Sequence, residues 1–467
     1  MASFKYFAMG AFGMAVLCGC AATPLPELPA EDVPSTWQKS TSGADAWPNS
    51  DWWNNFQSTE LGDVIALVEQ KNFDLQNNER NLRLAQLALR DAGFDLLPTP
   101  VVDFGASTNY FGSKIADGDF TDGSTDSFNL GAGFVYSDIL SKPAEYDAAK
   151  ARYESTLALL ADTRLNTLGT AASTYFRILL LRDRIEAAQQ NVENADAIAK
   201  IVSARVNAGT VNQVSLLQQQ IAVQRERNNL SSLIQDEYAA RAALALLVAD
   251  SVQDFNVLAT TLDDVLVPEI QPGLPSNLLH RRPDIVQAEA NLKLSRADVD
   301  LARLAYLPDI SLTGSVRLAS DSLGDLLGDG TTTTTATASL VQLIFDNGSR
   351  GRNVERQRLE LESALANYRE TVIAAFNEID VSLGNIELLR ALGEVAAEDL
   401  KRAEESFRIA EARYREGVDD FQTVLISQNQ LFDTRNSYFD NKLAQLNAAI
   451  AFYQSLGGGW QIEGQAP

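Results

Sequence analysis

The chain contains one pattern twice, and the second copy starts about 208 residues after the first. Ala204-Arg205 and Gly209 return as Ala412-Arg413 and Gly417, each 208 positions later. Other blocks return at offsets of 208 or 210: Asn81-Leu82-Arg83-Leu84 as Asn291-Leu292-Lys293-Leu294, Leu97-Pro98 as Leu307-Pro308, and Glu154-Ser155 as Glu362-Ser363. This internal duplication predicts two copies of one supersecondary unit that cannot bury its faces alone. It favours a role in architecture and assembly over a single catalytic pocket.

Residues 1–19 are predicted to be a lipoprotein signal peptide. Lys5 precedes the apolar stretch 6–17, which is too short to span a membrane as a helix. The stretch ends in Leu17-Cys18-Gly19-Cys20, which resembles the bacterial lipobox. The resemblance implies that Cys20 is the first mature residue and carries acyl chains in the outer membrane. The alternative is an ordinary signal peptide followed by a chance cysteine.

The segment that starts at the lipobox cysteine, residues 20–60, has four prolines between positions 24 and 34 and is expected to be an extended tether from the membrane surface. Cleavage would remove Cys18, and no third cysteine exists in the chain. The mature protein is therefore expected to contain no intramolecular disulfide.

Four segments alternate apolar with small polar residues over about ten positions each, at about 101–112, 127–137, 309–319 and 334–345. Phe134 belongs to the apolar face of its segment and Asn129 to the polar face. Such alternation is typical of transmembrane β-strands, with lipid outside and water inside. A half-buried strand of a soluble sandwich shows the same pattern, but a sandwich needs a second sheet and the chain offers only four such segments. Polar, glycine-rich loops are expected between the strands, at 114–126 and 320–334.

Four strands cannot close a barrel, and an open sheet edge is not tolerated in hydrocarbon. Several chains must therefore share one barrel. Two chains would give eight strands with little room for a channel, whereas three would give twelve. The predicted fold is mainly α with transmembrane β, a homotrimer with a shared twelve-stranded barrel.

The rest of the chain is predicted to form long helices. Residues 61–95, 143–206 and 350–416 read as helical, and in the last of these apolar residues recur every 3.5 positions, as in a left-handed coiled coil. A helix of sixty-odd residues is roughly 95 Å long. Each long helix should turn at a glycine, Gly209 or Gly417, and run back. The expected divisions are repeat 1 at 61–249, a linker at 250–275, repeat 2 at 276–456 and a tail at 457–467.

Composition argues against catalysis and against nucleic acid. The net charge is −24 and no basic patch is available to neutralise phosphates. We find no His/Cys spacing typical of metal sites, no Walker-type loop and no nucleophile elbow. No catalytic residue, metal or cofactor is therefore predicted, and the protein is not expected to be an enzyme.

Several strings resemble the TolC-like outer-membrane efflux factors, specifically the lipidated NodT-type group. They are Trp52-Trp53-Asn54-Asn55-Phe56, Arg281-Arg282-Pro283-Asp284-Ile285, Leu307-Pro308-Asp309-Ile310-Ser311-Leu312-Thr313-Gly314 and Leu343-Ile344-Phe345-Asp346. The resemblance implies a trimeric barrel continued by an α-helical coiled-coil tunnel across the periplasm. It also implies two partners, a periplasmic adaptor protein and an inner-membrane pump of the RND type.

The same resemblance implies site residues at the two glycine turns. The adaptor would contact Gly209, Thr210, Gly417 and Val418. Tyr414 matches a tyrosine that takes part in closing the channel in this family, while Asp419 stands where an arginine can occur. Asp419 and Asp420 are the acids left to line the mouth.

Two classes of function are compatible with these features. The first is a passive duct that carries small molecules from an adaptor and pump to the outside. The second is a structural or adhesive coiled-coil outer-membrane lipoprotein without a conduit. The four amphipathic segments favour the duct, because an adhesin has no need of them.

Overall fold

The structure is a computed structural model, and it describes residues 49–114, 120–269, 281–328, 330–458 and 460. These residues fall into two compact units, one built from 82–156 and 287–368 and the other from the rest. The expected signal peptide and Cys20 lie outside the described residues. Among the described helices, none combines the length and apolar character needed to cross a membrane.

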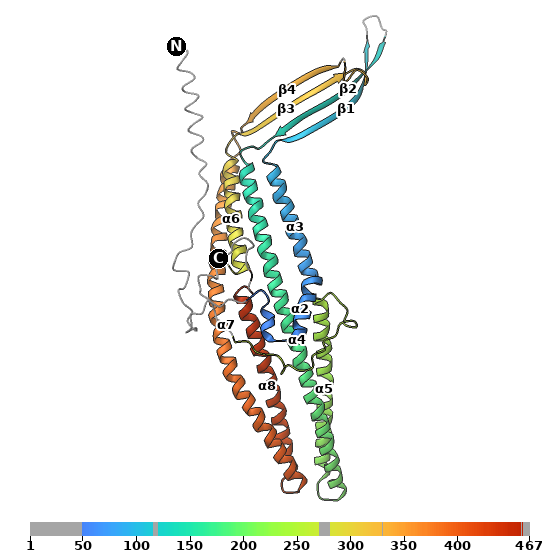
Figure 1. Ribbon diagram of the computed structural model, residues 1–467, viewed down its shortest axis with the longest axis vertical. Coiled ribbons are helices and arrows are strands. Elements are labelled where there is room, and N and C mark those ends of the chain that lie inside the picture. The colour runs from blue at the N-terminus through green and yellow to red at the C-terminus, as the bar shows by residue number, and fades with distance from the viewer. Residues whose placement is uncertain (1–48, 115–119, 270–280, 329, 459, 461–467) are drawn as a thin grey trace. The chain divides into compact units, whose positions relative to one another are not determined.

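The first unit contains one four-stranded antiparallel sheet with the order β1-β2-β3-β4. The strands are β1 Thr99–Lys114, β2 Phe120–Tyr136, β3 Asp309–Ser320 and β4 Thr331–Val341. Each repeat supplies one β-hairpin. The two hairpins are joined by the antiparallel pairing of β2 with β3, in which Phe128 lies opposite Ser320 at one end and Tyr136 opposite Leu312 at the other. The sheet is strongly curved (Figure 1). The register keeps the predicted alternation, because Phe134 pairs with Gly314 and Ala132 with Val316 on one face, while Asn129 lies on the other.

Two strands, β2 and β4, differ from the sequence-based expectation by more than two residues at one or both ends. β2 begins at Phe120 rather than near 127, because residues 120–126 continue the ladder opposite Tyr110 and its neighbours in one long hairpin. The expected loop 114–126 is therefore mostly strand, apart from 115–119, which lie outside the described residues. β4 spans Thr331–Val341 rather than 334–345, because the threonine run favours strand and Val341 pairs with Asp309, the first residue of β3. Residues beyond Val341 have no partner on β3.

The helical segment expected at 61–95 is two helices, α2 Thr59–Lys71 and α3 Phe73–Phe94. The break falls at Asn72, whose side-chain oxygen accepts hydrogen bonds from the backbone amides of Asp74 at 2.9 Å and Leu75 at 3.1 Å. Asparagine competes for the backbone amides in this way and so starts a new helix. The predicted long helices are present as α4 Lys142–Asn207 and α7 Ser349–Arg415. The remaining long helices are α5 Gln213–Leu247, α6 Pro283–Leu304 and α8 Phe421–Ser455.

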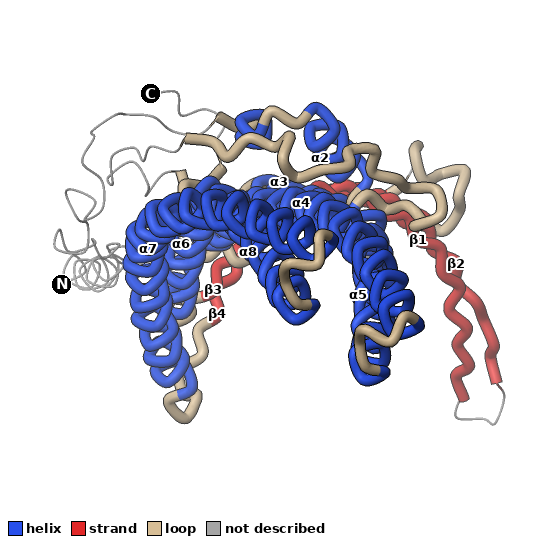
Figure 2. The backbone as a smooth tube through the Cα atoms, turned by 90° about the horizontal axis from the view of Figure 1, so that it is seen from below, coloured by secondary structure: helices blue, strands red, loops and turns tan. Residues whose placement is uncertain are grey.

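The second unit is built around two helical hairpins, α4–α5 and α7–α8. Seen from below, α7, α8, α4 and α5 follow one another in a curved row (Figure 2). The hairpins repeat one ion pair at equivalent positions: Arg227 with Asp196 at 2.9 Å and, 208 residues later, Arg435 with Glu404 at 3.2 Å. The duplication seen in the sequence thus includes this ion pair.

The largest core of this unit gathers residues from segments far apart in sequence. The short 3-10 helix η3, Trp52–Phe56, places its aromatic rings against Phe176 of α4 and Tyr453 of α8. The segment expected to be a linker contributes Phe255, Val257, Leu262 and Val265 to the same core. The described part of that segment therefore packs in the core.

Candidate docking and gating site at the hairpin turns

Each helical hairpin turns at a glycine in the left-handed conformation. Gly209 has φ 73° and Gly417 has φ 78°. The amide after each glycine reaches back to the helix, from Thr210 to the Arg205 carbonyl at 3.0 Å and from Val418 to the Arg413 carbonyl at 2.9 Å. This bonding satisfies helix-end carbonyls and requires a positive φ, which costs a non-glycine residue about 1–2 kcal/mol. The two turns, residues 208–212 and 416–420, are called the hairpin tips below.

The returning helices begin with a side-chain cap. The Asn212 oxygen accepts from the Ser215 amide at 3.0 Å, and Asp420 accepts from the Thr423 amide at 2.9 Å. The hydrogen bond from the Thr423 amide lowers the pKa of the Asp420 carboxyl below its ordinary value. Asp420 is therefore the N-cap of α8.

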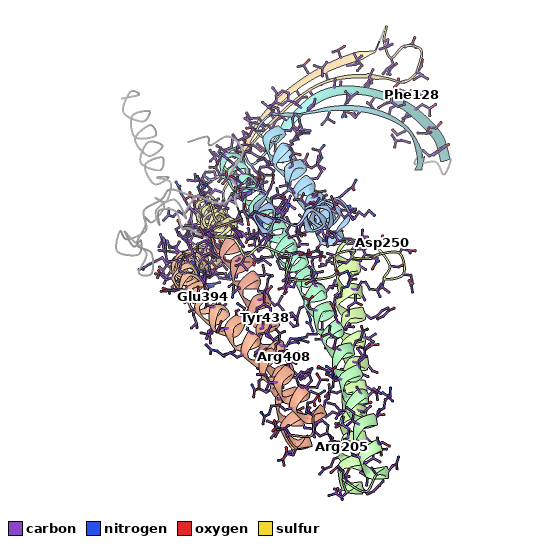
Figure 3. The ribbon with its side chains drawn as sticks, turned by 60° about the horizontal axis from the view of Figure 1, so that its bottom comes forward. Phe128, Arg205, Asp250, Glu394, Arg408 and Tyr438 are labelled. Atoms are coloured by element: carbon purple, nitrogen blue, oxygen red, sulfur yellow. The ribbon has the colours of Figure 1, made fainter. Side chains whose placement is uncertain are left out.

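Arg205 joins the two hairpins next to the tips. Its guanidinium lies 4.2 Å from the ring centroid of Tyr414, and it donates to the Tyr414 carbonyl at 3.0 Å. Tyr414 is 2% exposed and packs in a small core with Val202 and Val424. Figure 3 shows Arg205 beside the turns at the lower end of the second unit.

Arg413, the equivalent of Arg205 in the second repeat, has a different partner. It donates twice to the Asp419 carboxylate, at 2.7 Å and 3.0 Å. The hydrogen bond from this guanidinium lowers the pKa of Asp419, and the same bond raises that of Arg413. Arg413 thus joins the second tip to its own helix α7, whereas Arg205 joins the first hairpin to the second.

The structure places six of the seven predicted residues in two turns at the same end of the second unit, and the seventh, Tyr414, in the last turn of α7 beside them. Thr210 and Val418 are exposed, and a side chain at either glycine would meet no atom within 4 Å. The tips therefore offer open surface, as docking requires. The carboxylates of Asp419 and Asp420 are engaged in the ion pair and the helix cap, and the Tyr414 ring is buried, so their gating role stays a prediction.

Sequence reasoning overlooked Arg205 and the groove beside the second tip. Arg205 could have been found, because the repeat aligns it with Arg413. The groove has a volume of about 680 Å³ and is lined by Lys401, Arg402, Glu405, Ser406, Ile409, Ala410, Arg413, Asp419 and Thr423. Arg402 pairs with Glu398 and Asp399, and Arg413 with Asp419. Within the described chain no ion pair engages Lys401, so it is a cation available to a partner.

The described residues offer no group of three or more His, Cys, Asp or Glu placed to hold a metal ion. The tips contain backbone turns, caps and paired charges.

Comparison with known proteins assigns the chain to a family. The family described as "Outer membrane efflux protein" matches residues 64–250 and 274–458, one segment in each repeat. The chain is 30% identical over 457 residues to the pyoverdine export outer membrane protein OpmQ of Pseudomonas aeruginosa, covering 96% of both chains. It is 25% identical over 462 residues to the cation efflux system protein CusC of Escherichia coli, covering 95% of this chain and 97% of the other.

Solved channel structures share the fold. The Campylobacter jejuni CmeC outer membrane channel superimposes with a TM-score of 0.83 at 22% identity, covering 96% of each chain. The open state of the Neisseria gonorrhoeae MtrE outer membrane channel gives 0.79 at 23% identity, covering 96% of this chain and 100% of that one. The predicted TolC-like fold is therefore confirmed.

Proposed function

Because this chain belongs to the outer membrane efflux protein family, we propose that it is the outer-membrane duct of a tripartite efflux system. The role of efflux channel follows from the family and from the relatives named for export and efflux. The proposal adds the assembly, the partners and the anchor.

The sheet supports a homotrimer. β1 and β4 are its first and last strands, and in the described chain neither has a strand partner on its outer side. Edges of this kind cannot remain open in hydrocarbon. Three copies would join β1 of one chain to β4 of the next and close a twelve-stranded barrel, with the face that carries Phe134 toward lipid and the face that carries Asn129 toward water.

The hairpin tips support docking of a periplasmic adaptor. The exposed positions Thr210 and Val418 and the groove beside Lys401 lie where two hairpins end together. A helical hairpin of the adaptor would fit between such ends, and an acidic side chain on it would find Lys401 unpaired. An inner-membrane pump of the RND type would supply the energy, and the duct would be passive.

The relatives are named for different cargoes, pyoverdine in one case and cations in another. A water-filled duct with few specific contacts explains how one fold accommodates both. We therefore infer that the cargo of this chain is small molecules selected by the partner pump.

The lipobox-like string supports an acylated Cys20 that anchors the protein in the outer membrane. Cys20→Ser should abolish labelling with radioactive palmitate. Unchanged labelling would contradict the anchor without affecting the barrel, which can insert by its own apolar face.

One observation carries the proposal, namely a sheet with one apolar face, one polar face and two unpartnered edges. The test is the mass of the purified protein in mild detergent, measured by light scattering with the detergent subtracted. We expect three chains per particle. A well-folded monomer would overturn the shared barrel, and it would favour the adhesive lipoprotein without a conduit.

A further inference from the structure

One ion pair on the polar face of the sheet joins strands that are not neighbours. Arg317 of β3 donates to Asp103 of β1 at 3.2 Å, although β2 lies between them. The register puts both residues and Gly131 of β2 in one row, Asp103–Gly131–Arg317. Cα atoms two strands apart are about 9–10 Å from each other, so only a long side chain can cover that distance.

Gly131 makes the crossing possible. A Cβ built on this residue would collide with the Asp103 carboxylate. The glycine does not have a positive φ, so its role is to leave space rather than to make a turn. Its missing side chain lets the guanidinium and the carboxylate meet above β2.

The rest of this face is nearly free of charge. Among the described side chains of this face, the other cross-strand hydrogen bonds join hydroxyls, Ser107 with Ser127 at 2.9 Å and Ser311 with Ser339 at 2.5 Å. Among the described strand residues, the register gives this face one further charged side chain, Asp309, eight positions before Arg317 at the start of β3. The pair therefore dominates the local electrostatics of the polar face.

We propose that Asp103 and Arg317 are a charge-balanced selectivity element of the duct, which presents one carboxylate and one guanidinium to each passing ion or solute. The inference rests on the proposed function, because the polar face lines the lumen only if the sheet closes with its copies. Both side chains remain about half exposed, at 48% and 53%, so they are paired yet accessible to water. In a trimer the element would occur three times at one height.

The balance of the two opposite charges in this pair has a measurable consequence for ion permeability. While both charges are present, neither cations nor anions are favoured at this height. Removing one partner leaves three like charges around the ion path. A charge about 10 Å from an ion in water changes its local concentration roughly twofold, and three such charges change it up to about eightfold. The effect must be measured near 0.1 M salt, since at 1 M the screening length falls to about 3 Å.

The experiment compares the K⁺/Cl⁻ permeability ratio of full-length variants from reversal potentials in planar bilayers under a KCl gradient. Asp103→Asn should lower the ratio roughly two- to eightfold, and Arg317→Gln should raise it by a similar factor. The exchanged pair Asp103→Arg with Arg317→Asp should return it close to wild type. Asp126→Asn is the matched control, because Asp126 of β2 lies on the apolar face and bonds to Thr108, so it should leave the ratio unchanged.

The outcomes separate the two claims. Channels that conduct but show the same ratio in Asp103→Asn, Arg317→Gln and the control would overturn the selectivity element alone. The selectivity element would also be overturned if the K⁺/Cl⁻ ratio of the exchanged pair differed from the wild-type ratio as much as that of a single variant does. Absence of conductance in the wild type and in every variant would instead contradict the duct.

Discussion

The guanidinium of Arg205 lies 4.2 Å from the ring centroid of Tyr414 and donates to its carbonyl oxygen at 3.0 Å. Arg205 lies in the last turn of α4, the long helix of the first repeat, and Tyr414 lies in the last turn of α7, that of the second. The Arg205 side chain therefore joins the two hairpins next to their turns. If the tips must separate to open the duct, this contact must break.

Loss of the Arg205–Tyr414 contact should favour the open channel. A partly desolvated cation–π contact contributes about 0.5–2 kcal/mol, so Arg205→Ala should raise the ratio of open to closed time roughly 2- to 30-fold. Arg205→Lys should have an intermediate effect, because lysine keeps the charge and loses the planar stacking. Single-channel dwell times measure the ratio. Arg227→Ala, which breaks the exposed pair with Asp196, is the control, and an equal effect there would rule out a specific latch.

Substitutions at the tips can separate the effect of side-chain bulk from the effect of backbone strain. Gly209 and Gly417 need a positive φ, so replacing them with tryptophan would change both. Thr210→Trp and Val418→Trp add bulk at exposed positions and keep both glycines. We expect them to preserve the trimer and to abolish crosslinking to the adaptor and efflux. Gly209→Ala, which adds strain with little bulk, should retain docking. Normal efflux by both tryptophan variants would show that docking occurs elsewhere.

Tyr175 should make the second unit sensitive to alkaline pH. Burial raises the pKa of this phenol to about 12. Its hydroxyl donates to Glu60 at 3.0 Å, and Glu60 also accepts from the Ala259 amide at 2.9 Å. The native state retains a proton that the unfolded chain releases near pH 10, so stability is full below about pH 10 and falls as the pH rises toward 12.

This loss should be on the order of 2–3 kcal/mol. Thermal melts followed by circular dichroism in detergent at pH 9 to 12 should show a fall in the wild type that is reduced in Tyr175→Phe. Tyr238→Phe, at a position 43% exposed, should melt like the wild type throughout. An unchanged slope in Tyr175→Phe would remove this tyrosine from the alkaline transition.

A charge on the apolar face of the sheet should prevent insertion. Phe134→Arg places a guanidinium where the barrel model puts lipid, at a cost of about 2–4 kcal/mol near the midplane. The yield of trimer in outer-membrane fractions should fall sharply. Asn129→Arg, on the other face of the same strand, should insert normally and shift ion selectivity. Equal yields for the two variants would contradict the assignment of the faces.

Much of the architecture could be predicted from the sequence, because period-two alternation and glycine-ended helices are local signals. The strand alternation set the faces correctly, and the 208-residue offset placed both turns. The start of β2 was missed because residues 120–126 join the ladder only through their partners on β1, a contact that no local pattern encodes. The break at Asn72 depends on one side chain whose capping competes with helix continuation.

The partners at the tips could not be predicted from the repeat alone. Arg205 and Arg413 occupy equivalent positions, yet they bind different groups. The second repeat has Asp419 where the first has Val211, and Tyr414 where the first has Val206. With no acid in its own turn, Arg205 reaches the neighbouring hairpin. The repeat therefore predicts where each arginine lies, whereas tertiary packing determines which group it binds.

Planar-bilayer recording of the purified, full-length protein tests the conduit most directly. Wild type and the double variant Arg205→Ala with Tyr414→Ala should be recorded side by side, so that closure at the tips is not mistaken for the lack of a pore. We expect discrete conductance steps of one unitary size in the wild type, and larger or longer openings in the double variant. Trimers that insert in the bilayer and give no steps in either protein would contradict the conduit.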